Sequence, residues 1–284
     1  MIIITGATGQ LGSRIVERLL ERVPANEVGV SVRDAAKASS MAERGVRVRT
    51  GDFTEPAGLE HAFEGADRVL IISAAIRGDA AVAANKTAID AARVAGARRI
   101  LYTSHQAAAK DSLFAPQLTH ADTEEYLAGL GVPFTALRNG FYASTLGYYV
   151  GAALRTGELV VPEDGPFSWT AHDDLAEAAA IALADDGVLD GVTPPLTAPE
   201  LLDFEAVAAI LSDLTGRRIT RVTAGDDEWK AGAVANGVPE PAAEFTLGMF
   251  RAARRGEFAV ADPTLEKLLG RPATPARAVL EGLI

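Results

Sequence analysis

Three glycines near the start of the chain have the spacing that an anion-binding turn requires. They follow an apolar run and precede an amphipathic one, in the order GxxGxxG. Gly6 permits a tight turn, Gly9 lets the backbone approach a pyrophosphate, and Gly12 lets a helix pack on a strand. In this strand–turn–helix context the spacing predicts a dinucleotide site at the start of the helix. Its expected members are Gly6, Ala7, Thr8, Gly9, Gln10 and Leu11.

Basic side chains after the next β-rich run indicate which dinucleotide binds. Arg33 stands where NAD-binding proteins place an acidic residue for the ribose hydroxyls. Its guanidinium can bind a 2′-phosphate through two parallel N–H bonds, and Lys37 can add a point charge. These residues predict NADPH (NADP) as the cofactor. The alternative is that Arg33 only pairs with Asp34 at the surface.

Two further runs are placed to complete this site. Asp52 and Phe53 follow the third β-rich run and are expected to flank the adenine, the alternative being the start of a helix. Ala74, Ala75 and Ile76 follow the fourth run and are expected to line the nicotinamide ribose, because small side chains allow close approach.

The positions of these residues depend on a regular alternation of strands and helices. Strands are predicted at Ile2–Thr5, Val28–Val32, Val46–Thr50, Arg68–Ser73, Arg99–Ser104 and Pro133–Leu137. Helices are predicted at Gln10–Arg22, Ala35–Arg44, Pro56–Glu64, Asp79–Ala95 and Leu118–Leu130. This order predicts an α/β Rossmann fold, a doubly wound parallel sheet, over residues 1–140.

The pattern loosens beyond residue 140. We expect a helix at Asp174–Ala184, a strand at Val192–Ala198, a helix at Asp203–Thr215, a strand at Arg218–Thr223 and several short helices after it. Residues 141–284 are therefore predicted to form a smaller, mostly helical substrate lobe, from which a later strand could return to the main sheet. The substrate is expected in the cleft between the lobes.

Composition excludes several classes of function. A formal charge of −11 over 284 residues argues against nucleic-acid binding, because phosphate neutralisation needs a basic face. The absence of cysteine excludes disulfides and thiolate metal sites, and no metal site is predicted. No run is long enough to cross a membrane, and the start of the chain reads as a strand and not a signal peptide. We expect a cytoplasmic protein, monomeric or homodimeric.

Several motifs together resemble the NmrA-like branch of the atypical short-chain dehydrogenase/reductases. They are the glycine run, Val32-Arg33, Gly51-Asp52, Tyr102-Thr103-Ser104, His120-Ala121-Asp122-Thr123-Glu124 and Leu137-Arg138-Asn139-Gly140. The chain is most similar to type 2 NAD(P)H:quinone oxidoreductases, with triphenylmethane reductases as close neighbours. The resemblance extends over nearly the whole chain.

One departure from the superfamily pattern has chemical content. Typical members reduce carbonyls with a Ser and a Tyr-x-x-x-Lys pair. Ser104 stands where the resemblance places the Ser, but His120 and Glu124 stand where Tyr and Lys belong. A simple ketone develops a localised alkoxide and needs a strong proton donor, whereas a quinone or cationic dye spreads the incoming charge and needs mainly positioning. His120 is the best-placed proton donor among the four histidines, the alternative being a packing role.

The resemblance also assigns residues to the reacting end of the site. It implies that Arg138, Asn139, Gly140 and Phe141 contact the nicotinamide end of the cofactor and that His172 lies near the cofactor. The alternative for His172, which the residues themselves favour, is a helix-cap position beside Asp173 and Asp174. Phe141 and Tyr142 could hold a flat ring between them, although such a pair is often part of the core. We assign His120 and Tyr142 to catalysis.

Two functions from different classes fit these observations. The first is an enzyme that passes hydride directly from NADPH to a quinone-like aromatic acceptor. The second is a non-catalytic NADP(H)-binding redox sensor of the NmrA type. A sugar epimerase or carbonyl reductase is disfavoured by His120 and Glu124. No flavin is predicted, although a glycine loop alone would permit one.

Overall fold

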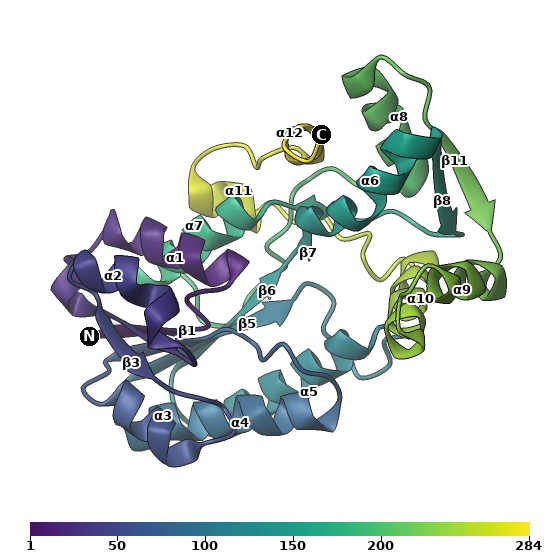
Figure 1. The fold of residues 1–284 in the computed structure, drawn as a ribbon. Helices are drawn as coiled ribbons and strands as arrows, with labels where there is room; N and C mark the ends of the chain where they lie inside the picture. Colours follow the sequence, from purple (N-terminus) through teal and green to yellow (C-terminus); the bar gives the residue numbers. More distant parts are fainter.

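The computed structural model describes residues 1–284 and contains a seven-stranded parallel sheet (Figure 1). The strand order is β3-β2-β1-β4-β5-β6-β10, which reverses direction at β1 as in a doubly wound fold. The strands are β1 (Ile2–Thr5), β2 (Val28–Val32), β3 (Arg47–Thr50), β4 (Arg68–Ile71), β5 (Arg99–His105), β6 (Phe134–Asn139) and β10 (Gly191–Val192). The Rossmann prediction is confirmed.

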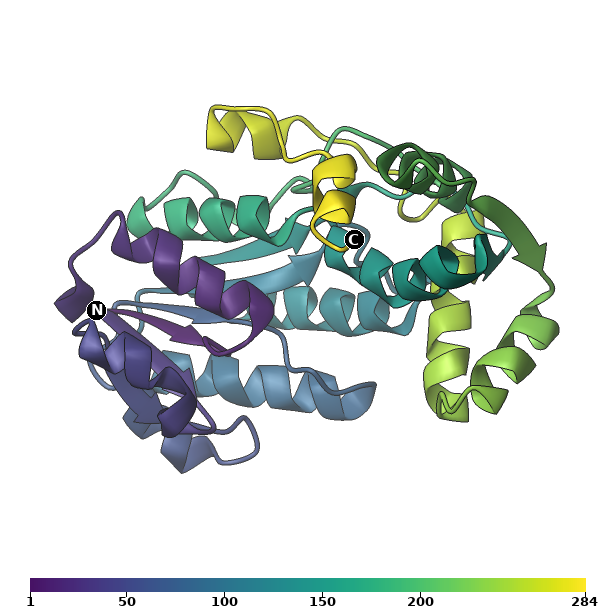
Figure 2. The same cartoon turned by 45° about the horizontal axis from the view of Figure 1, so that its top comes forward.

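Helices cover both faces of this sheet, as Figure 2 shows. One face carries α1 (Gln10–Leu20), α7 (His172–Ala184) and α11 (Thr264–Leu269), which share an apolar core with β1 and β2. The other carries α3 (Pro56–Phe63), α4 (Asp79–Val94) and α5 (Ala115–Gly129). Both faces of the strands are therefore buried, which explains why their sequences are apolar runs. The short helix α2 (Ser39–Glu43) follows a 3-10 turn at Ala35–Ala38 beside β3.

The predicted elements differ from the structure mainly at their ends. β5 continues one residue further than expected, because His105 pairs with Asn139 of β6. The strand expected at Val192–Ala198 is wrong beyond Val192: Pro194 and Pro195 have no N–H to donate to a ladder, and only Leu196 makes a further bridge, to Asn139.

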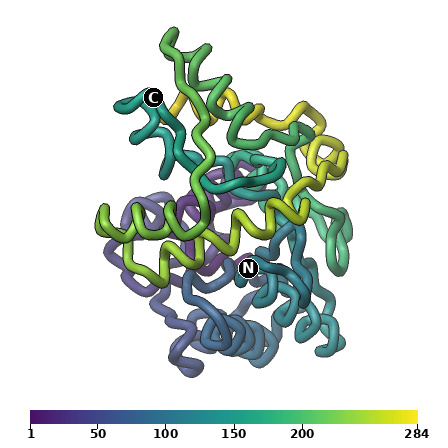
Figure 3. Tube along the Cα trace, turned by 90° about the vertical axis from the view of Figure 1, so that its right-hand side faces the viewer, coloured from purple at the N-terminus to yellow at the C-terminus, as the bar shows by residue number.

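The second lobe is built mainly from helices around an aromatic core. It contains α6 (Gly147–Thr156), α8 (Phe204–Thr215), α9 (Asp226–Ala235), α10 (Glu240–Arg254) and α12 (Ala276–Glu281), with a two-stranded sheet of β8 (Glu158–Pro162) and β11 (Thr220–Ala224). Buried rings of Phe167, Trp169, Phe204, Phe250 and Phe258 pack at its centre. Figure 3 shows α9 and α10 crossing the side of the molecule that faces away from β1.

The chain passes between the lobes more than once. A two-residue strand, β7 (Phe141–Tyr142), pairs with β9 (Trp169–Thr170), and the chain then re-enters the first lobe as α7 and β10. A cut at residue 140 therefore separates α7, β10 and α11 from the sheet and helices on which they pack. No helix has the length and apolar character that crossing a bilayer would take.

Candidate functional site

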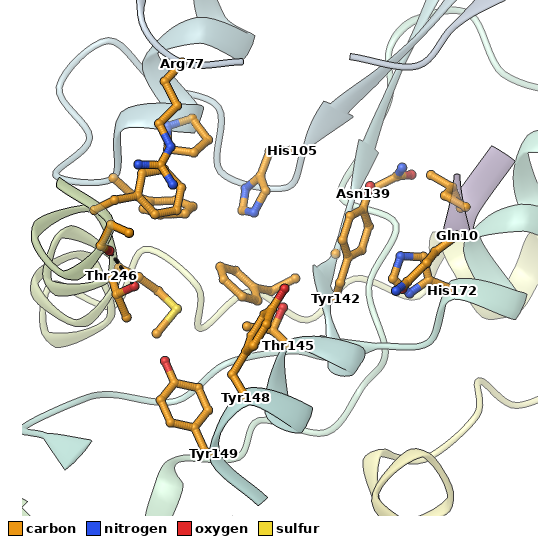
Figure 4. A pocket seen from close by; sticks show the side chains of 18 of the residues that line it. Gln10, Arg77, His105, Asn139, Tyr142, Thr145, Tyr148, Tyr149, His172 and Thr246 are labelled. Atoms are coloured by element: carbon orange, nitrogen blue, oxygen red, sulfur yellow. Dashed lines mark hydrogen bonds between the residues drawn. The ribbon is translucent and has the colours of Figure 1, made fainter. Parts of the chain in front are cut away.

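A cavity of about 1310 Å³ lies between the two lobes. Its floor is formed by the segments that leave the C-terminal ends of β1, β4, β5 and β6, which is where open parallel sheets bind ligands. The second lobe encloses the opposite side with aromatic and apolar side chains of α6, α9 and α10, among them Trp229 and Phe245. Figure 4 shows Tyr148 and Tyr149 of α6 on this side of the cavity. Only Arg77, Arg155 and Glu158 of its lining residues belong to the Lys, Arg, Asp and Glu classes.

Twelve of the predicted site residues line this cavity together. They come from all four strand ends and from α5 and α7, although they are far apart in the sequence. They are Gly6, Gly9, Gln10, Leu11, Ala74, Ser104, His120, Asn139, Gly140, Phe141, Tyr142 and His172. The structure thus brings together these twelve residues, which include both residues that we assign to catalysis.

The glycine loop has the geometry that the sequence predicts. Gly6 has a φ of +60°, and a Cβ at Gly12 would overlap the Gly6 carbonyl oxygen and come within 2.9 Å of the Ala7 Cα. No side chain caps the N-terminus of α1, so its first N–H groups are available to an anion. Ala7 is fully buried beneath the loop, and Thr8 is exposed beside it.

The residues predicted to select the dinucleotide lie outside the main cavity. Arg33 and Lys37 are exposed after β2 and form no ion pair, so the alternative pairing of Arg33 with Asp34 is not observed. The Asp34 carboxylate instead accepts the Ala36 N–H at 3.1 Å. Asp52 accepts the N–H and hydroxyl of Thr54, at 2.8 and 2.7 Å, and these bonds hold the pKa of Asp52 below its usual value.

Two residues that the sequence predicts to line the nicotinamide ribose lie at a smaller adjoining cavity. Ala75 and Ile76 face a space of about 290 Å³ next to the main one. Arg77 stands between the two, with its guanidinium 4.1 Å from the ring centre of Phe245 in α10, so this contact joins the lobes. Phe53 is half-buried against the core beneath α3.

Ser104, Glu124 and Arg138 form one buried polar cluster. The Ser104 hydroxyl donates to Glu124 Oε1 at 2.6 Å, and Arg138 donates to the same carboxylate from Nε at 3.0 Å and Nη2 at 2.7 Å. The Arg138 guanidinium therefore points to Glu124, and Arg138 is absent from the cavity lining. Since Ser104 has a single hydroxyl proton, it cannot also donate to a substrate.

His120 belongs to a second polar network. Its Nδ1 lies 2.8 Å from the Tyr102 hydroxyl, which also lies 3.2 Å from both Ser73 Oγ and Asn85 Nδ2. Burial lowers the pKa of His120 to about 4 and raises that of Tyr102 to about 12. His120 is thus a neutral imidazole at pH 7, and its ring lines the cavity.

Sequence reasoning missed His105. This residue is the last of β5 and points into the cavity (Figure 4). Its ring lies 6.1 Å from that of His120, with the two planes within 23° of each other. Burial lowers its pKa to about 3, with a further contribution from His120. Its position in the sequence could have indicated a site residue, because it follows Ser104 directly at the end of a predicted strand.

The aromatic pair after β6 divides between two environments. Phe141 is buried and packs edge-on against Trp169 and Phe258 of the second-lobe core. Tyr142 packs on His172, with ring centres 4.3 Å apart, and burial raises the pKa of its phenol. The two rings contact different neighbours, although both line the cavity.

Gly140 allows the chain to turn between this pair and β6. A Cβ there would overlap the Thr170 hydroxyl and come within 2.7 Å of the Thr170 Cβ. The predicted Gly140 is therefore required by packing between β6 and β9. Its neighbour Asn139 has a buried side-chain oxygen without a hydrogen-bond partner, on the cavity side of β6.

Comparison with known proteins places the chain in a defined family. Residues 1–274 of this chain match the NmrA-like family. Quinone oxidoreductase 2 of Escherichia coli (strain K12) is 33% identical over 275 residues, which are 96% of this chain and 95% of that protein. NAD(P)H azoreductase of Xenophilus azovorans is 30% identical, over 96% of this chain and 94% of that protein.

Solved structures give the same result. The NADPH complex of the Escherichia coli NADPH-dependent quinone oxidoreductase matches with a TM-score of 0.94 and 31% identity, covering 100% of this chain and 99% of the other. The NADP(H) complex of the Citrobacter sp. triphenylmethane reductase matches with a TM-score of 0.94 and 32% identity, covering both chains completely.

Proposed function

The chain belongs to the NmrA-like family, and on this basis we propose that it is an NADPH-dependent reductase that transfers hydride directly to quinone-like conjugated acceptors. The observation that carries this proposal is the engagement of Ser104 with Glu124, at 2.6 Å, in a site without the Tyr-Lys pair. A site that lacks a strong proton donor suits acceptors whose conjugated system spreads the incoming charge.

The residues of the glycine loop and of β2 fit the cofactor. The turn at Gly6 and the uncapped start of α1 would hold a pyrophosphate, and the unpaired Arg33 and Lys37 would bind a 2′-phosphate. When bound, NADPH supplies the hydride. We assign Ala74, Ala75, Ile76, Asn139 and His172 to its nicotinamide end, and Asp52 and Phe53 to its adenine end. His120 and Tyr142 keep their assignment to catalysis.

The chain's own residues would then bind and orient the acceptor. The aromatic side chains of the second lobe offer flat surfaces, and the neutral rings of His105 and His120 line the same cavity. The similarity to a quinone oxidoreductase, an azoreductase and a triphenylmethane reductase supports conjugated acceptors and favours an enzyme over a redox sensor.

Two measurements test this function. NADPH oxidation with benzoquinones, naphthoquinones, an azo dye and a cationic triarylmethane dye should show saturable turnover with at least one class. Calorimetry with NADPH and NADH should show binding, with NADPH tighter. Tight NADPH binding without turnover across the panel would favour the sensor, and the absence of any heat would refute the dinucleotide site itself.

We also propose that the protein is cytoplasmic, that it is a monomer or homodimer, and that it binds neither flavin nor metal. Colourless purified protein is expected, since a bound flavin would make it yellow.

A further inference from the structure

We propose that His105 and His120 together form a pair of neutral N–H donors for the reducible heteroatom of the acceptor, a quinone carbonyl oxygen or an azo nitrogen. This inference rests on the proposed function and assigns His105 a role in binding the acceptor. It also makes Tyr102 a positioning residue, which acts through His120.

The tautomer of His105 follows from its one hydrogen bond. Its Nδ1 accepts the backbone N–H of Ala107 at 3.4 Å. A neutral imidazole carries its hydrogen on the nitrogen that does not accept, so Nε2 holds the proton. No protein group bonds to Nε2. This atom is accessible and not fully buried, so it borders the cavity that His105 lines.

Aromatic neighbours fix the plane of the His105 ring. Phe114, Phe141 and Phe258 meet it edge-on, with ring centres 6.3, 5.6 and 5.8 Å away. Rotation of the imidazole would break these contacts, and their apolar surroundings strengthen any hydrogen bond that Nε2 forms. The ring is therefore a preorganised donor.

Tyr102 sets the tautomer of His120. The phenol has one proton and two nearby acceptors, His120 Nδ1 at 2.8 Å and Ser73 Oγ at 3.2 Å. The shorter distance favours donation to His120. Asn85, whose side-chain oxygen accepts the Ala74 N–H at 3.0 Å, donates to the phenol oxygen. With Nδ1 accepting, the His120 hydrogen is also on Nε2.

Two neutral donors suit a charge that develops during the reaction. Burial keeps both imidazoles uncharged at pH 7, and their rings lie nearly parallel 6.1 Å apart. A fixed N–H dipole in a water-excluded site stabilises a developing oxyanion without the desolvation cost of a charged side chain. The pair can thus polarise the heteroatom of the acceptor, which Ser104 cannot do because its hydroxyl donates to Glu124.

The balance of atoms distinguishes the acceptor classes. A quinone takes up one hydride and one solvent proton to give a hydroquinone, and an azo group takes hydride on one nitrogen and the proton on the other. A cationic triarylmethane dye takes hydride at its central carbon and becomes neutral, with no proton. The donors therefore assist the first two classes, whereas in the third no heteroatom gains negative charge during hydride transfer.

Acceptor selectivity tests the pair. His105→Phe keeps the ring packing, and Tyr102→Phe keeps the ring but removes the phenol. For both variants kcat/KM with a naphthoquinone and with a cationic triarylmethane dye is measured at saturating NADPH. The expected result is a quinone-to-dye ratio at least tenfold below that of the unsubstituted protein, mainly through kcat. His61→Phe, on the exposed face of α3, is the matched control and should leave the ratio unchanged.

Equal losses with both acceptors, or no loss with the quinone, would overturn the proposal. An independent arm uses long-range ¹H–¹⁵N spectra of the histidine rings in the unliganded protein. Both His105 and His120 should carry the hydrogen on Nε2, and Tyr102→Phe should change the His120 pattern alone. A hydrogen on His105 Nδ1 would refute the pair even if neither acceptor is reduced, whereas correct tautomers without turnover would count against the proposed function only.

Discussion

The Arg138 guanidinium binds the Glu124 carboxylate at two points beneath the cavity, with Nε 3.0 Å from Oε1 and Nη2 2.7 Å from Oε2. The pair joins β6 to α5, and Oε1 also accepts the Ser104 hydroxyl from β5. Three elements that converge on the reacting end are therefore held by one carboxylate. Glu124 is only 7% exposed, so water cannot replace a lost partner.

Removing Glu124 should destabilise the protein strongly. Glu124→Ala leaves the Arg138 charge without its partner, and we expect the free energy of unfolding to fall by about 3–5 kcal/mol. The double variant Glu124→Ala/Arg138→Met should recover part of this loss, as measured by urea denaturation. Asp213→Ala breaks the exposed pair with Arg277 and should cost less than about 1 kcal/mol. Fully additive effects of the two substitutions at the buried pair would contradict this account.

Charge reversal at Arg33 should change the choice of dinucleotide. Arg33→Asp removes the guanidinium that is free to bind a 2′-phosphate, so KM for NADPH should rise about tenfold to hundredfold, with a much smaller effect on NADH. Arg18→Asp, which changes charge equally on the exposed face of α1, should leave the NADPH-to-NADH ratio intact. Equal effects of Arg33→Asp on both nucleotides would refute the assignment.

A methyl group at Gly12 should damage both stability and binding. The added Cβ would collide with the backbone of Gly6 and Ala7, which cannot move without opening the loop. We expect Gly12→Ala to cost about 1–3 kcal/mol in thermal or urea unfolding and to weaken NADPH binding in calorimetry. Gly58 lies in α3, and a Cβ added there would be 4.0 Å from the nearest atom. Gly58→Ala should therefore be neutral or up to about 1 kcal/mol more stable. Similar behaviour of the two variants would count against the tight loop.

The buried histidines should make the protein less stable in mild acid. The pKa of His105 is about 3 and that of His120 about 4 in the folded chain, against 6.5 when unfolded. As the pH falls below 6.5 the unfolded chain binds these protons first, so stability is complete above pH 6.5 and declines toward pH 4. Between pH 6.5 and 5 each histidine contributes a loss of about 2 kcal/mol. In urea unfolding, the stability of His105→Phe should depend less steeply on pH than that of the unsubstituted protein. The control variant His61→Gln should keep the pH dependence of the unsubstituted protein.

Much of the fold and part of the site follow from local sequence. The strand and helix positions of the first lobe agree with the alternation of apolar runs and amphipathic segments, and the turn at Gly6 follows from glycine spacing. These features depend on backbone preferences and hydrophobic periodicity, which short stretches already contain. The last strand of the sheet is less predictable, because the Pro194-Pro195 run interrupts a strand that its neighbours favour.

The amino-acid sequence by itself determined the glycine turn before α1, the basic residue after β2 and the loss of the Tyr-Lys pair. Only the tertiary structure decided that Arg138 turns toward Glu124 and that His105 enters the cavity. The reason is that both outcomes depend on contacts between separate elements. Pairing of His105 with Asn139 extends β5, and the packing of α5 against β5 and β6 brings Glu124 to Ser104 and Arg138. No local pattern encodes such a meeting of side chains.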